Sequence, residues 1–291
     1  MTDKTNPWWS NKGGFFGIRY LEGDDSLEGY IPGKSETLEE RTKREVDGVI
    51  KLLNLKKEDH ILDMPCGYGR HTIELIIRGF RPKGEDINES LVYEAENRLC
   101  LEAKKRNPNP NFEPACWGYF GIEDMRHITD NPISLQAQRS GFSPEIYNAI
   151  INMFYSFGFF ETDEENEKVM KEFFKSLKPN GKLLIHTDVS PEIIKSGAYK
   201  FNETRNLKSG KILIINEAYI SENKRMNGSW TLIDKNGFQE QLTPYSVRIY
   251  TKEEFEEMAK ITGFKESRFY GSFEGEEFSK NSREMIMVAR K

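Results

Sequence analysis

The sequence predicts an α/β protein with a doubly wound, mostly parallel seven-stranded sheet and an antiparallel β insertion. Between residues 60 and 188, short apolar strands alternate with longer amphipathic helices, which is typical of right-handed strand-helix-strand units. Between residues 198 and 250, apolar and polar residues alternate with a period of two, as in an antiparallel sheet with one exposed face. One helix and two strands follow, at 265–272 and 283–290, so we expect the sheet to end in an antiparallel strand.

The elements of the core follow from apolar runs and from the residues that cap helices. The first helix begins at a candidate capping box formed by Thr37 and Glu40, and it is expected to end near Asn54. The next helices are predicted at 70–78, 89–106, 163–177 and 251–262, with Gly79, Pro179-Asn180-Gly181 and Gly263 as end signals. The core strands are predicted at 60–64, 82–86, 115–119, 146–151 and 182–187.

Changes in residue composition and in hydrophobic periodicity divide the chain into four segments. Residues 1–35 are rich in glycine and aromatic residues and are interpreted as an arm or a lid. Residues 36–190 form the core, and residues 191–250 form the insertion, in which Asn236-Gly237 offers a tight hairpin turn. Residues 251–291 supply the last helix and the strands that complete the core sheet.

Composition excludes several classes of protein. Asp and Glu outnumber Lys and Arg by 47 to 42, giving a formal net charge of -5, so we expect no nucleic-acid partner. Residues 1–10 lack the apolar run of a signal peptide, and the longest apolar stretch, 149–160, is too short to cross a bilayer. Three cysteines without metal-ligand spacing predict reduced thiols in the cytoplasm, with neither a disulfide nor a bound metal.

The segment from His60 to Arg70 joins an apolar strand, a glycine-bearing turn and a helix. Gly67 and Gly69 let the backbone approach a bound group closely, while the helix N-terminus presents free N–H groups to an anion. A dinucleotide fingerprint would need a third glycine where Thr72 stands, so NAD is the weaker interpretation.

Further polar residues follow the next strands of the predicted sheet. Asp86 ends the second strand, where its carboxylate can accept both hydroxyls of a ribose. After the third strand, Asp124 can accept a hydrogen bond from the amino group of adenine, and Met125 can pack on the adenine ring. Asn152 begins the segment after the fourth strand, at the same carboxyl edge. Together these residues predict an adenosine site.

With these motifs in place, residues 60–188 resemble a class I S-adenosylmethionine-dependent methyltransferase with a Rossmann-like core, although Pro65 replaces the first glycine of the usual signature. The resemblance implies S-adenosylmethionine as the cofactor. It places Gly67 and Gly69 beside the methionyl part, Asp86 on the ribose, and Asp124 with Met125 on adenine. Further cofactor contacts are expected from Tyr20, Asp63, Pro65, Arg70, Ile87 and Asn152.

Three flanking segments, 152–158, 247–251 and 270–273, resemble the amino-sugar and glycine/sarcosine N-methyltransferases. That resemblance implies that residues 191–250 cover the substrate and that an aromatic N-terminal segment closes over the cofactor. His186, Asp188 and Tyr155 are the candidate catalytic residues, with a plain polar pair as the alternative for the first two. Arg248, Tyr250 and Tyr270 are the candidate substrate residues, although an arginine at a strand edge also forms ordinary ion pairs.

These observations predict an enzyme that methylates a small molecule, at an amine nitrogen. A sulfonium-bound methyl group is already activated, so alignment of the acceptor and exclusion of water suffice for transfer. Methylation at oxygen or carbon, and a non-catalytic scaffold that binds the cofactor, remain as alternatives. An RNA methyltransferase is disfavoured by the negative net charge. The insertion's strand edge leaves a homo-oligomer open.

Overall fold

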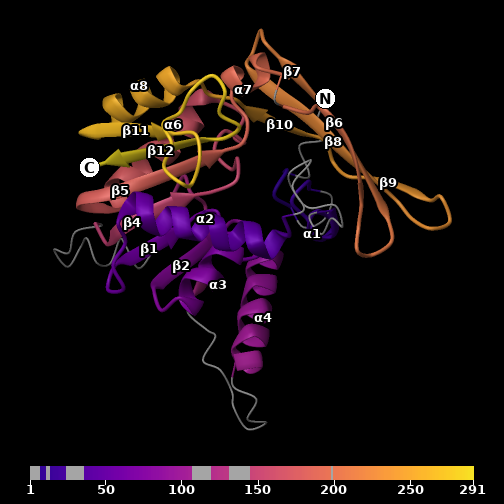
Figure 1. Cartoon of the computed structure of the whole chain (residues 1–291), viewed down its shortest axis with the longest axis horizontal. Coiled ribbons are helices and arrows are strands. Elements are labelled where there is room, and N and C mark those ends of the chain that lie inside the picture. Colours follow the sequence, from indigo (N-terminus) through magenta and orange to yellow (C-terminus); the bar gives the residue numbers. More distant parts are fainter. Residues whose placement is uncertain (1–6, 11–13, 24–35, 107–118, 131–144, 198) are drawn as a thin grey trace.

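The computed structural model describes residues 7–10, 14–23, 36–106, 119–130, 145–197 and 199–291, and its centre is a seven-stranded sheet (Figure 1). The strand order is β11-β12-β5-β4-β1-β2-β3. The strands are β1 (His60–Asp63), β2 (Arg81–Asp86), β3 (Phe120–Ile122), β4 (Tyr147–Asn152), β5 (Leu177–Thr187), β11 (Glu266–Tyr270) and β12 (Met285–Arg290). Strands β1 to β5 pair in parallel, and β12 lies antiparallel between β5 and β11. The predicted Rossmann-like sheet with an antiparallel last strand is confirmed.

Helices flank the sheet and begin at the capping residues that the sequence indicates. They are α2 (Leu38–Leu53), α3 (Arg70–Ile77), α4 (Glu89–Arg106), α6 (Asp163–Ser176) and α8 (Lys252–Thr262), with a 3₁₀ turn, η1 (Ile128–Asp130), and short helices α1 (Ile18–Gly23) and α7 (Pro191–Lys195). Thr37 with Glu40 and Thr251 with Glu254 form the predicted capping boxes. Within the described residues, the helices are too short or too polar to pass through a membrane.

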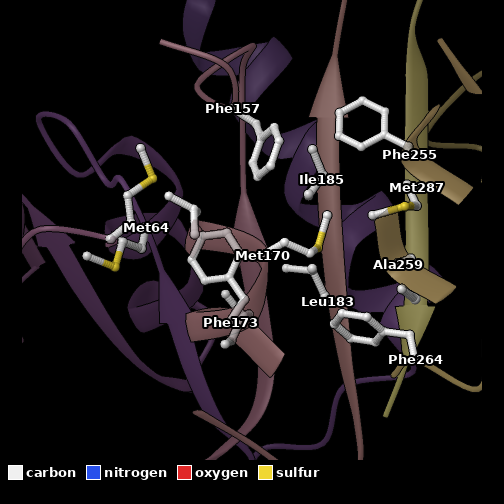
Figure 2. Close-up of a cluster of buried hydrophobic side chains, with 14 of the residues drawn as sticks. Met64, Phe157, Met170, Phe173, Leu183, Ile185, Phe255, Ala259, Phe264 and Met287 are labelled. Atoms are coloured by element: carbon white, nitrogen blue, oxygen red, sulfur yellow. The ribbon is translucent and has the colours of Figure 1, made fainter. Parts of the chain in front are cut away.

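The inner strands β4, β5 and β12 carry apolar runs because both faces of the sheet are covered, whereas the inner strand β2 is mostly polar. One face packs Leu183 and Ile185 of β5 against Met170 and Phe173 of α6 and against side chains of α8 (Figure 2). The opposite face carries the alternate strand residues, among them Ile61 of β1, which pack against α2 and α3. The period-two alternation of the strands therefore divides the core into two layers.

The insertion folds as a second, antiparallel sheet, which we call the cap (Figure 1). Its strands are β6 (Asn202–Asn206), β7 (Ile212–Ile220), β8 (Arg225–Ile233), β9 (Gln239–Gln241) and β10 (Tyr245–Arg248). They run in the order β10-β8-β7-β6, and β9 pairs with β8 after a turn at Gly237. This sheet confirms the predicted antiparallel insertion.

The described part of the N-terminal segment, residues 7–10 and 14–23, packs between the core and the cap. The ring of Trp8 lies 5.1 Å from that of Phe159 of the core. The ring of Phe15 lies 5.1 Å from Trp230 and 4.4 Å from Tyr245 of the cap. Aromatic packing therefore ties this segment to both sheets. Residues 1–6, 11–13 and 24–35 of the predicted arm lie outside the described residues.

Two boundaries differ from the expectation. The third strand is described at Phe120–Ile122, later than the predicted 115–119, of which 115–118 and the cysteine at 116 lie outside the described residues. Strand β5 begins at Leu177, before the Pro179-Asn180-Gly181 signal. That signal stands inside the strand as an irregularity, with Asn180 at a φ of 65°, because the helix has already ended at Ser176.

Candidate functional site

The site begins at the turn between β1 and α3. Gly67 and Gly69 both adopt left-handed backbone conformations, with φ of 55° and 80°. A Cβ on Gly69 would lie 2.8 Å from Ala95 and from the ring of Phe120, whereas a Cβ on Gly67 would meet nothing within 4 Å. Gly69 is therefore needed for packing, and Gly67 leaves open space beside the start of α3.

Asp86 is the polar centre of this turn. Its Oδ2 accepts the N–H of Gly67 at 2.9 Å, and its Oδ1 accepts the N–H of Asn88 at 2.8 Å. In the described part of the chain no lysine or arginine pairs with this buried carboxylate, and burial raises its pKa to about 6. Each carboxylate oxygen retains capacity for a second hydrogen bond, so the group can accept a pair of ligand hydroxyls.

A narrow cavity of about 100 Å³, which we call the inner cavity, opens beside Gly67 and Asp86. It is lined by the predicted cofactor residues Tyr20, Pro65, Gly67, Arg70, Asp86, Ile87, Asp124 and Met125. Trp8 and Trp9 line it from the N-terminal segment. The Asn88 amide donates to the carbonyls of Trp9 and Phe16 at 2.7 and 2.8 Å, which holds that segment over the turn.

Asp124, the residue predicted to bind adenine, has a charged neighbour. Both oxygens of Asp124 accept hydrogen bonds from the Arg126 guanidinium, which holds the pKa of Asp124 below its usual value against the opposing effect of burial. Met125 is buried beside it and packs into the core. An amino group that bound to Asp124 would share the carboxylate with Arg126.

Two predicted cofactor residues lie behind the cavity wall. Asp63 is fully buried; one oxygen accepts the Thr72 hydroxyl at 2.6 Å, and burial raises its pKa to about 7. Asn152 is also fully buried and donates to the carbonyl of Met64 at 2.9 Å. Both residues support the turn from beneath and do not line the inner cavity.

A buried ionic cluster lies at the other end of the turn. The Glu45 carboxylate contacts Arg41 at 2.6 Å, Arg70 at 2.5 Å and His71 at 2.8 Å. The guanidinium groups of Arg41 and Arg70 hold the pKa of Glu45 well below its usual value although burial opposes them, and burial together with Arg70 lowers the pKa of His71 to about 4. With a neutral imidazole, two guanidinium groups share the Glu45 carboxylate, and that of Arg41 also lies 4.0 Å from the Asp188 carboxylate.

A second cavity of about 1040 Å³, the outer cavity, lies between the core and the cap. Phe16, Tyr20, Phe154 and Phe159 line both cavities, so the two adjoin. Of the predicted catalytic residues, Tyr155 and Asp188 line the outer cavity. The Tyr155 hydroxyl is buried and has no hydrogen-bond partner in the part of the chain that the structure describes, and burial raises its pKa.

His186 does not reach either cavity. It is fully buried, its Nδ1 accepts the N–H of Phe154 at 3.2 Å, and its Nε2 lies 3.0 Å from the Glu284 carboxylate. Successive residues of a strand point to opposite faces of the sheet. The location of His186 near the end of β5 therefore did not tell which way its side chain points. Its position corresponds to a structural contact and not to a base.

The predicted substrate residues also lie elsewhere. Arg248 is buried and pairs with Glu254 at 2.6 Å and with Asp163 at 3.3 Å. Tyr250 donates to Asp163 at 3.1 Å within the core. Tyr270 packs against the opposite core layer, and none of the three lines a cavity. Arg248 of β10 joins the cap to α6 and α8, because Asp163 and Glu254 on those helices compensate its buried guanidinium.

Several residues of the outer cavity escaped the sequence analysis, above all Glu217, Tyr199 and Tyr245. One signal was present in the sequence. The inward positions of β7 are Leu213, Ile215 and Glu217, so the glutamate is a charged residue in an otherwise apolar row.

Comparison with known proteins places this geometry in context. No family model matches the chain. YqeM of Bacillus subtilis, a curated protein named as a candidate methyltransferase, is 24% identical over 241 residues, which cover 82% of this chain and 86% of YqeM. The CcbJ methyltransferase from Streptomyces caelestis is 17% identical, with a TM-score of 0.63 over 85% of this chain and 88% of that one. CalS10, an amino pentose methyltransferase from Micromonospora echinaspora solved with S-adenosylmethionine bound, is 18% identical, with a TM-score of 0.58 over 89% of this chain and 93% of that one.

This chain has the fold of class I S-adenosylmethionine-dependent methyltransferases. In that fold, the carboxyl edge of the parallel strands is the ligand-binding edge. Asp86, Asp124 and the Gly67 turn all stand on this edge.

Proposed function

We propose that this protein transfers the methyl group of S-adenosylmethionine to a small-molecule acceptor, at an amine nitrogen. The observation that carries the proposal is the buried Asp86 carboxylate, which faces the inner cavity without a cationic partner among the described residues. A ribose diol would supply the two donors that such a carboxylate requires.

The residues present fit the cofactor at both of its ends. Gly67 leaves open space beside the turn, and Asp86 stands next to it for the ribose. Arg70 lines the same cavity, and its guanidinium suits the carboxylate of a methionyl group. When bound, S-adenosylmethionine supplies a methyl group that its sulfonium has already activated.

The protein's own contribution is to position the acceptor and to exclude water. Trp8, Trp9, Phe16 and Tyr20 line the inner cavity from the N-terminal segment, and the cap bounds the outer cavity. Such enclosure raises the rate by proximity and orientation, without a covalent residue. Tyr155 and Asp188 are the candidate residues for orienting the acceptor, because both line the outer cavity.

Two observations favour an amine over a hydroxyl or an acidic carbon. Asp188 and Glu203 of the outer cavity pair with Arg41 and Arg205, but Glu217 has no lysine or arginine partner among the described residues and lies within aromatic walls, an environment that suits a cation. In addition, the structural neighbour CalS10 is an amino pentose methyltransferase. Methylation at oxygen or carbon would require a general base; of the two candidates, His186 is buried outside the cavity and Asp188 lines it.

The test combines cofactor binding with turnover. Calorimetric titration with S-adenosylhomocysteine should show binding to the wild type that weakens in Asp86→Asn but not in Asp47→Asn, which removes an exposed carboxylate from α2. A panel of small amines and matched alcohols should then yield S-adenosylhomocysteine from S-adenosylmethionine with amines. Binding without turnover of any acceptor would favour a scaffold, and turnover of alcohols alone would contradict nitrogen methylation.

A further inference from the structure

The cap carries a carboxylate whose surroundings the proposed reaction does not yet explain. Glu217 lies on the inward row of β7 and lines the outer cavity. The Tyr199 hydroxyl donates to one of its oxygens at 2.5 Å, and the Tyr245 hydroxyl donates to the other. In the described part of the chain the carboxylate has no lysine or arginine partner.

The register of the cap strands β7, β8 and β10 builds this arrangement. Gly228 of β8 pairs with Glu217 on one side and with Tyr245 on the other, so the three residues lie abreast across three strands. A Cβ on Gly228 would collide with the ring and the hydroxyl of Tyr245. The glycine therefore lets the Tyr245 side chain lie across the backbone of β8 and reach Glu217.

Aromatic rings surround the same end of the cavity. The ring of Phe15 lies 4.4 Å from Tyr245 and 5.1 Å from Trp230, and the ring of Tyr20 stacks on Trp230 at 5.2 Å. All four residues line the outer cavity. The face of an aromatic ring attracts a cation, and several rings around one carboxylate are typical of sites for substituted ammonium groups.

Two further observations point to a missing ligand. The Tyr155 hydroxyl, which lines the same cavity, is buried without a hydrogen-bond partner among the described residues. Burial, together with the neighbouring carboxylates of Asp188 and Glu203, raises the pKa of Glu217, although the two tyrosine hydroxyls oppose this shift. Asp188 and Glu203 pair with Arg41 and Arg205, so a ligand cation would serve Glu217, and its N–H groups could satisfy the tyrosine.

We infer that Glu217, held by Tyr199 and Tyr245 within this aromatic wall, is the binding site for a protonated or substituted ammonium group of the acceptor. The inference rests on the proposed function, because it gives the acceptor cavity its chemical selectivity. Glu217 is then the group that distinguishes a cationic amine from a neutral molecule of the same shape. A bound ammonium that is to be methylated first gives its proton to this carboxylate or to solvent, because only the neutral amine has the lone pair that attacks the methyl group.

The test uses benzyltrimethylammonium as the cationic probe and benzyl alcohol as the neutral one. Both are titrated by saturation-transfer NMR, with and without S-adenosylhomocysteine. The wild type should bind the ammonium probe more tightly than the alcohol. Glu217→Gln should weaken ammonium binding by about tenfold or more, the usual effect of losing a charged partner, and leave alcohol binding unchanged.

Two variants separate this role from a structural one. Glu276→Gln removes a carboxylate from the exposed side of the same cavity, and should change ammonium binding by less than about twofold because solvent screens that charge. Gly228→Ala displaces Tyr245 from Glu217 and should weaken ammonium binding while S-adenosylhomocysteine still binds. Thermal midpoints of all variants verify that each is folded.

The outcomes distinguish this inference from the proposed function. Equal ammonium binding by the wild type and Glu217→Gln would overturn the inference, as would equal binding of the two probes or no binding of the ammonium probe by the wild type. If the wild type did not bind S-adenosylhomocysteine, the proposed function would be overturned instead. The ammonium titration done without S-adenosylhomocysteine would still test the inference about Glu217.

Discussion

Replacing Asp86 by asparagine should abolish tight binding of S-adenosylhomocysteine while leaving the protein folded. The carboxylate accepts two backbone N–H groups and has one remaining acceptor position on each oxygen for a ribose hydroxyl. Asparagine has one oxygen, so at most one hydroxyl keeps its acceptor, and that acceptor is neutral. A hydrogen bond to a charged group contributes about 1.5–3 kcal/mol, so the affinity should fall by about 10- to 100-fold.

The fold should survive because two effects offset each other. Burial raises the pKa of Asp86 from 3.8 to about 6. The folded protein therefore holds this proton more tightly than the unfolded chain, and stability falls as the pH rises between these two values. At pH 7 the ionised group costs about 3 kcal/mol, which asparagine removes. Asparagine leaves the N–H of Gly67 or Asn88 without an acceptor, which costs about 1–3 kcal/mol.

The pH dependence of S-adenosylhomocysteine binding tests the role of the Asp86 carboxylate separately. A ribose diol donates to the ionised carboxylate, so protonation competes with the ligand below the pKa of about 6. For the wild type, the dissociation constant should rise about tenfold from pH 7 to pH 5. In Asp86→Asn this component is absent, and the ionisable groups of the ligand contribute equally to both proteins.

Isothermal titration calorimetry at several pH values, with thermal unfolding as the control, tests both expectations. Comparable affinity for the variant and the wild type at pH 7 would refute the assignment of Asp86 to the ribose. Parallel pH profiles for the two proteins would show that another group, such as the buried Asp63, causes the dependence.

Three further substitutions test the supports of the site. Gly69→Ala should lower the free energy of unfolding in urea by about 2–4 kcal/mol, since it adds both backbone strain and overlap, whereas Gly79→Ala, at a similar φ with open space, should cost about 1 kcal/mol. Glu45→Gln should destabilise by about 3–5 kcal/mol in the same assay because two buried guanidinium groups lose their counter-ion; an unchanged urea midpoint would argue against the cluster. Asn88→Ala should release the N-terminal segment and increase tryptic cleavage within residues 1–35, a change that would be missing if aromatic packing alone held the segment.

The sequence alone predicted the core sheet, the helices and the turn that carries the cofactor residues. These features depend on signals that act over a few residues. Apolar runs specify the buried strands, and Thr37 with Glu40 caps a helix within one turn. Gly67 and Asp86 were found because strand ends of a parallel sheet meet at one edge, so order along the chain is enough to bring them together.

Only the tertiary structure decided which side chains face the cavities. His186 and Arg248 stand near the expected elements, but each is buried against a partner distant in the sequence, Glu284 for His186 and Asp163 for Arg248. Glu217 reaches Tyr245 because Gly228 lies between them in register. Strand register and the direction of a side chain depend on packing between distant segments, and no local pattern of residues encodes them.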